Sequence, residues 1–252
     1  MSEGADKPIV VFKKGFVINQ LRRDAPRIAE SFDRLCDNDL VVMDKYASRA
    51  FMLILTGMKH AEQNSHDVRA TCGQLLLNAL ASWLAALDLL RDGFILQPGV
   101  LLRNMIETLI AVLCIFGDAK HWAAFQADKL KPEGEVGTAS KVFPAFGQLY
   151  GFLSGTFTHV RKTYANLHPI MVYESRDYPP LDANINTLRI TLWLCYVVAE
   201  LVYHGVSKGF YWKALGGNAF EYVVSEKGLA MQIELLGADP AELAAETPKD
   251  NA

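Results

Sequence analysis

The sequence PGVLLRNMIETLIAVLCIF, residues 98–116, predicts one long helix. Pro98 suits a first helical turn, where its missing N–H costs nothing, and the next break is Gly117-Asp118. At about 100° per residue the strongly polar side chains fall within an arc of roughly 140°, and apolar side chains cover the rest of the circumference. These polar residues are Arg103, Asn104, Glu107 and Thr108. We therefore expect a mostly buried helix on which Arg103 and Glu107, one turn apart, form a pair.

Helical spacing of apolar residues recurs on both sides of this stretch. The predicted helices cover residues 20–36, 40–61, 67–91, 98–116, 119–130, 138–159, 181–207 and 219–236, with a kink or break at Pro144. The short connection after residue 91 indicates that the two helices it joins pack antiparallel. We expect an all-α, up-and-down helical bundle of about seven to eight helices.

The bundle is expected to form one domain with flexible ends. The expected segments are an N-terminal arm at 1–19, the bundle at 20–236 and a flexible acidic tail at 237–252. Half of the 252 residues are hydrophobic (51%), which is enough for one core, and the net charge of −3 argues against a surface built as a whole for nucleic acid. The four cysteines stand far apart without CxxC spacing, so we expect reduced thiols in a cytoplasmic protein that needs neither zinc nor disulfides.

Two stretches are apolar enough to raise the question of a membrane, residues 100–116 and 187–206. Both carry ionisable side chains near their middles, namely Arg103, Glu107, Arg189, Glu200 and His204. A charge at the bilayer centre costs about 2.5 to 3.5 kcal/mol, so no membrane span is expected.

A second polar stripe lies on the helix predicted at 181–207. It spans roughly 100° of the helix surface. Its members are Arg189, Trp193, Tyr196, Glu200, Tyr203, His204 and Ser207. If it faces the first stripe, Arg103, Glu107, Glu200 and His204 share a buried polar pocket. That pocket is either a structural ion-pair network or a site for a small anionic ligand.

The same carboxylates and imidazoles suggest a metal as a further alternative. Glu107, His159, Glu200 and His204 could together hold zinc, manganese or iron. The chain has no HExxH and no second Glu–His pair of the kind that ferritin-like bundles use, so no cofactor is expected.

The segment LYGFLSGTFTHVRK at 149–162, taken with LLRNMIETL at 101–109, resembles a family of uncharacterised bacterial all-helical proteins. The residues that carry the resemblance are Arg103, Glu107, Tyr150, Ser154 and His159. It covers roughly residues 75–205 and implies a fold rather than an activity. With the second stripe, we predict a ligand-binding set of Arg103, Glu107, Tyr150, Ser154, His159, Tyr196, Glu200, Tyr203 and His204.

Families of this shape are sometimes compared with HEPN helical bundles, many of which are ribonucleases. Their motif places an arginine, a polar residue and a histidine on one helix, so that the histidine acts on a ribose hydroxyl and the arginine steadies the phosphate. Arg161 and His168 have acceptable spacing for it, with His159 as a further candidate base, but Lys162 stands where the motif has a small polar residue. A metal-independent ribonuclease acting on RNA is therefore the alternative function.

The leading function from the sequence is a binding or interaction module with a polar pocket between its long helices. The helices predicted at 40–61 and 98–116 are apolar around most of their circumference. Together they carry more apolar surface than a single short bundle can bury. We therefore expect a homodimer that buries part of this surface.

Overall fold

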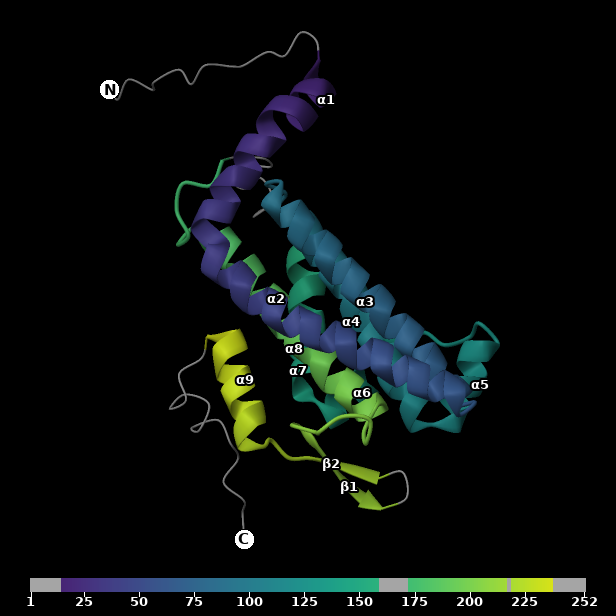
Figure 1. The fold of residues 1–252 in the computed structure, drawn as a ribbon. Helices are drawn as coiled ribbons and strands as arrows, with labels where there is room; N and C mark the ends of the chain where they lie inside the picture. Colours follow the sequence, from purple (N-terminus) through teal and green to yellow (C-terminus); the bar gives the residue numbers. More distant parts are fainter. Residues whose placement is uncertain (1–14, 159–171, 217–218, 238–252) are drawn as a thin grey trace, which may run out of the picture.

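The computed structural model describes residues 15–158, 172–216 and 219–237. The predicted all-α bundle is confirmed within these ranges (Figure 1). Most of the predicted arm, the acidic tail after residue 237 and the candidate residues His159, Arg161 and His168 lie outside the described residues.

The helices follow one another through almost the whole described chain. They are α1 (Phe16–Asn19), α2 (Ala25–Gln63), α3 (Asp67–Arg91), α4 (Gln97–Gly117), α5 (Ala119–Gln126), α6 (Val136–Val142), α7 (Pro144–Leu153), α8 (Pro179–Val202) and α9 (Glu226–Leu236). Three short turns of other helical types are η1 (Gln20–Asp24), η2 (Pro132–Gly134) and η3 (Ser154–Thr158). The strands β1 (Trp212–Gly216) and β2 (Ala219–Tyr222) form an antiparallel pair with Trp212 opposite Tyr222.

The first two predicted helices are a single long one. No glycine or proline separates residues 36 and 40, so α2 continues through that region and only Cys36 leaves helical geometry, with φ −114° and ψ 15°. Helical structure also begins at Phe16, inside the segment predicted as an arm, and runs through η1 into α2. In Figure 1 this first part of the chain projects beyond the rest of the bundle.

Helix α8 forms the centre of the core. It packs against α2, α3 and α4, while α3 and α4 pack against each other as the short loop between them predicted. Every residue from Thr191 to Val202 is buried. The indole Nε1 of Trp83 on α3 donates a hydrogen bond of 2.8 Å to the carbonyl of Leu188, which fixes α3 against α8.

The expectation of no membrane span is contradicted by these helices. Among the described residues, α3, α4 and α8 are each long and apolar enough to cross a membrane, judged by length and composition. The charges on which the expectation rested are too sparse to exclude this, because each helix contains an 18-residue segment with at most two charged side chains.

The C-terminal region differs from the single helix predicted at 219–236. Gly205 (φ 89°) takes a left-handed conformation that favours glycine, and α8 ends at Val202, before the predicted Ser207. The chain then forms the β1–β2 hairpin before α9 begins. Ser225 caps α9, because its Oγ accepts a hydrogen bond of 3.1 Å from the backbone N–H of Gly228.

Candidate functional site

The polar stripe of α4 forms a compact cluster with α7. Arg103 Nε donates to Glu107 Oε1 at 3.1 Å, so the predicted pair is confirmed, and Arg103 Nη2 donates to the Tyr150 hydroxyl at 2.9 Å. The guanidinium carbon lies 5.0 Å from the centre of the Tyr150 ring. Nearby in the chain, at the start of η3, Ser154 Oγ is buried with no hydrogen-bond partner among the described residues. Three residues of the predicted ligand-binding set therefore contact one another here.

Replacing Tyr150 with phenylalanine should lower the free energy of unfolding by about 1 to 2 kcal/mol, because a hydrogen bond to the partly buried Arg103 is lost. Urea unfolding measures the change. Tyr178→Phe is the matched control, since the Tyr178 hydroxyl has no hydrogen bond within the part of the chain that the structure describes. Equal losses in both variants would show that the Arg103–Tyr150 bond contributes nothing.

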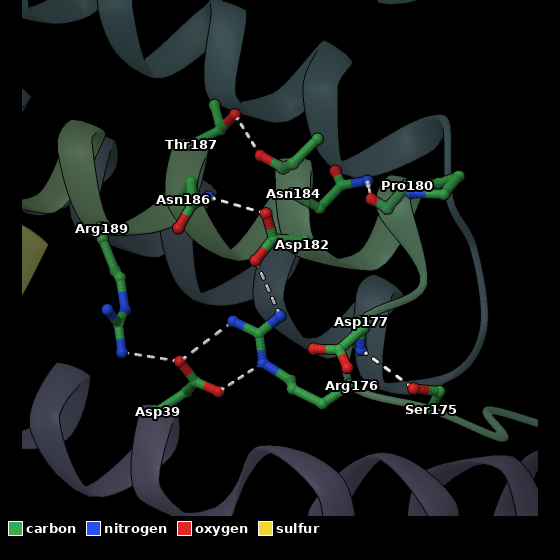
Figure 2. Close-up of polar contacts among 11 residues, drawn as sticks. Asp39, Ser175, Arg176, Asp177, Pro180, Asp182, Asn184, Asn186, Thr187 and Arg189 are labelled. Carbon is green, nitrogen blue, oxygen red and sulfur yellow. Dashed lines mark hydrogen bonds and ion pairs between the residues drawn. The ribbon is translucent and has the colours of Figure 1, made fainter. Parts of the chain in front are cut away.

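Arg189, the first member of the α8 stripe, belongs to a separate ion-pair network. Its Nη2 donates to Asp39 Oδ1 at 2.6 Å, and Arg176 Nε donates to Asp39 Oδ2 at 2.8 Å. Arg176 Nη1 also donates to Asp182 Oδ1 at 2.9 Å. Figure 2 shows Asp39 between the two guanidinium groups. The hydrogen bonds that Arg176 donates to Asp39 raise the pKa of Arg176 above its ordinary value. Two positive and two negative charges balance, so the network joins α2, α8 and the segment before α8 without leaving a charge for a ligand.

Glu200 anchors the chain that follows α8. Its side chain is buried, and Oε1 accepts hydrogen bonds from the backbone N–H groups of Phe210 (2.7 Å), Tyr211 (2.7 Å) and Trp212 (3.2 Å). Oε2 has no partner among the described residues. Burial raises the pKa of Glu200 above its ordinary value of 4.5. The carboxylate thus holds the start of β1 against α8.

Tyr203 and His204 have packing roles. The Tyr203 side chain is buried so closely that an added Cβ would overlap its ring at Gly57 and its hydroxyl at Gly73. The hydroxyl donates to the Arg69 carbonyl at 3.0 Å. The half-buried His204 ring lies 5.2 Å from that of Phe220.

Among the described residues, no hydrogen bond or ion pair joins the α4 stripe to the α8 stripe. The predicted polar pocket shared by the two stripes is therefore not formed by such contacts. The bonds of Arg103 and Glu107 run between themselves and to α7, whereas Glu200 binds the backbone before and at the start of β1. The proposed metal set of Glu107, Glu200 and His204 is likewise not among the groups of described residues that could hold an ion. Its fourth member, His159, lies outside the described residues.

A cavity of about 660 Å³ opens between α2, α8 and α9, and Tyr196 from the predicted set lines it. Its cationic side chains are Lys45, Arg49, Lys208 and Lys227, and its one carboxylate is Glu234. The buried apolar surface of the cavity comes from Leu53 and Met231, with Tyr196 stacked on Phe210 at 6.3 Å between ring centres. Cations thus surround an apolar floor.

Only one of the four cations in this cavity is neutralised by Glu234. Lys45 Nζ lies 2.7 Å from Glu234 Oε2, and the Tyr46 hydroxyl donates to the same oxygen. These hydrogen bonds lower the pKa of Glu234 and keep it ionised, and the bond from Lys45 contributes most. Arg49, Lys208 and Lys227 have no ion-pair partner among the described residues. Four positive charges less one negative charge leave an excess of three.

Two other cavities lack this imbalance of charge. A cavity of about 850 Å³ lies beside the hairpin and is lined largely by aromatic and aliphatic groups, and its one arginine, Arg69, is outnumbered by Asp67 and Asp118. A smaller one of about 250 Å³ contains Glu107. The cationic cavity is therefore the best candidate for binding an anion.

Sequence reasoning missed the cationic residues of this cavity. The signal that could have found part of the set is the spacing of Lys45 and Arg49, which places both on one face of α2. Lys208 and Lys227 come from distant segments that only the hairpin and α9 bring together. No protein-family model, curated protein or solved structure matches this chain.

Proposed function

We propose that this protein is a ligand-binding helical bundle whose cavity between α2, α8 and α9 takes an organic anion with an apolar body. The observation that carries the proposal is the excess of three positive charges around a buried apolar floor. The volume of about 660 Å³ falls in the range of about 300 to 1,000 Å³ that is usual for small-molecule sites.

The lining suggests how such a ligand would bind. A carboxylate, sulfonate or phosphate group would pair with Arg49, Lys208 and Lys227 at the rim, where the planar guanidinium can contact two oxygens at once. The apolar body would lie on Met231 and beside the stacked Tyr196 and Phe210 rings. Glu234, the one carboxylate of the described lining, is held by hydrogen bonds from Lys45 and the Tyr46 hydroxyl, which leaves the other cations to bind an anion.

Reversing two of the charges should weaken binding of an amphipathic anion. We expect Lys208→Glu combined with Lys227→Glu to raise the Kd for anilinonaphthalene sulfonate about tenfold or more, which is about 1.4 kcal/mol for each factor of ten. Fluorescence titration of the full chain measures the Kd. The wild-type affinity should also fall as salt is added, because the rim charges are exposed.

Two further variants separate the cavity from general surface charge. Lys213→Glu reverses a lysine on β1 that does not line the cavity, and it should leave the Kd unchanged. Ala230→Trp places a large ring in the cavity from an exposed position of α9 without changing charge, and it should weaken binding. An equal loss in Lys213→Glu, or unchanged binding in both cavity variants, would refute the proposal.

A further inference from the structure

Three side chains with metal-binding atoms meet where α4, α5 and α6 adjoin. Cys114 lies near the end of α4, His121 on α5, and Glu135 directly before α6. The sulfur, one ring nitrogen and one carboxylate oxygen all lie within 4.8 Å of one another. Cys114 is buried, whereas His121 and Glu135 are each about one quarter exposed (24% and 27%), so an ion could reach them from solvent.

The histidine is placed as a metal-binding histidine usually is. His121 Nε2 lies 3.4 Å from Glu135 Oε2, which is about the separation of two ligands bound at 2.0 to 2.1 Å to a tetrahedral ion. On the other side of the ring, Nδ1 lies 3.6 Å from Asp118 Oδ2. Metal-bound histidines commonly donate their second N–H to such a carboxylate.

Two further contacts support the same arrangement. His121 Nδ1 is buried and has no hydrogen-bond partner among the described residues, so a small approach to Asp118 would satisfy it. Thr138 Oγ1 donates to Glu135 Oε2 at 2.9 Å and thereby restrains the carboxylate. A simple His121–Glu135 ion pair would not account for the nearby cysteine sulfur.

We propose that Cys114, His121 and Glu135 bind one zinc ion, with a fourth position open to water or to a small ligand. A thiolate with imidazole and carboxylate suits zinc, whereas magnesium and calcium prefer oxygen ligands alone. Asp118 would act as a positioning residue through His121. The site shares no residue with the cationic cavity and does not depend on it.

Cobalt and zinc titrations of the full chain, freed of metal with a chelator and then dialysed, test the site. We expect one equivalent of Co²⁺ to give a thiolate-to-cobalt charge-transfer band and one equivalent of Zn²⁺ to displace it. Cys114→Ser should abolish the band. Cys114→Ser and Glu135→Gln should each weaken Zn²⁺ binding at least about 100-fold, and Asp118→Asn should weaken it about 10- to 100-fold.

Control variants make each result decisive. Cys72→Ser alters another buried cysteine, on α3, and should keep both the band and the Zn²⁺ affinity. Glu135→Gln changes a partly exposed residue, so it provides a folded test if Cys114→Ser does not fold, with circular dichroism as the check. No charge-transfer band in the wild type, or zinc bound as tightly by folded Glu135→Gln as by wild type, would overturn the proposal.

Discussion

Replacing Asp39 with alanine should lower the free energy of unfolding by about 3 to 5 kcal/mol, the usual loss when one partner of a buried ion pair is removed. The Asp39 side chain is 11% exposed and faces the guanidinium groups of Arg176 and Arg189, which are 27% and 15% exposed. Arg176 keeps its bond to Asp182, but Arg189 loses the one ion-pair partner it has among the described residues. Urea unfolding followed by circular dichroism measures the change.

A second aspartate on α2 provides the matched control for this experiment. Asp33 pairs with Arg91 at 2.7 Å, yet the two side chains are 42% and 40% exposed. Asp33→Ala should therefore lower the free energy of unfolding by no more than about 1 kcal/mol. Adding Arg189→Met to Asp39→Ala should recover part of the larger loss, because no unpaired charge then stays buried. Similar losses for Asp33→Ala and Asp39→Ala would contradict this account of the network.

The long apolar helices could be predicted from sequence because their signals are local. Helix α3 occupies the residues predicted for it, 67–91, and α4 begins one residue before the predicted Pro98. Both have many apolar positions and end near a glycine, so the apolar pattern and the helix-ending residue indicate the same limits for each helix. The predicted break after residue 36 is wrong because a polar run does not end a helix that tertiary contacts stabilise. Asp39, inside that run, is buried against Arg176 and Arg189.

The candidate site could be predicted only where its contacts are local. Arg103 and Glu107 are one turn apart, so their pairing follows from helix geometry alone. Glu200 instead binds three backbone N–H groups ten to twelve residues further along. Because every residue except proline has a backbone N–H, the residue types do not indicate which of these groups bind a side chain. Only β2 lies within the helix predicted at 219–236, and β1 falls between the predicted helices, so the sequence did not predict the hairpin.

The two proposed sites could not be predicted from the sequence either, because each joins residues from separate segments of the chain. The cavity cations come from α2, from the segment after α8 and from α9, which approach one another only in the folded chain. Cys114, His121 and Glu135 are seven and fourteen residues apart, a spacing that matches no short metal motif. The apolar neighbours of the cysteines predict reduced core thiols, and this pattern does not indicate that His121 and Glu135 lie near Cys114.

Replacing Glu200 with alanine should lower the free energy of unfolding by about 3 kcal/mol, because three N–H groups before and at the start of β1 lose their acceptor and each such loss costs about 1 to 3 kcal/mol. Removing a buried charge offsets part of the cost. Glu200→Gln keeps one oxygen as acceptor and should lose less, about 1 kcal/mol. Glu107→Ala, which removes a partly exposed carboxylate on α4, is the control and should change stability by no more than about 1 kcal/mol.

The pH dependence of stability should separate wild type from Glu200→Gln. Burial raises the pKa of Glu200 above the ordinary value of 4.5, so folding favours its protonated form. This contribution is fully present below pH 4.5 and is lost as the pH rises through the higher pKa of the folded protein. Acids that both variants share, such as Glu234 with its lowered pKa, cancel in the difference. Urea unfolding at a series of pH values should therefore show wild type losing stability relative to Glu200→Gln above pH 4.5. A difference that stays flat or moves the other way would mean that the three N–H groups outweigh the burial of the carboxylate.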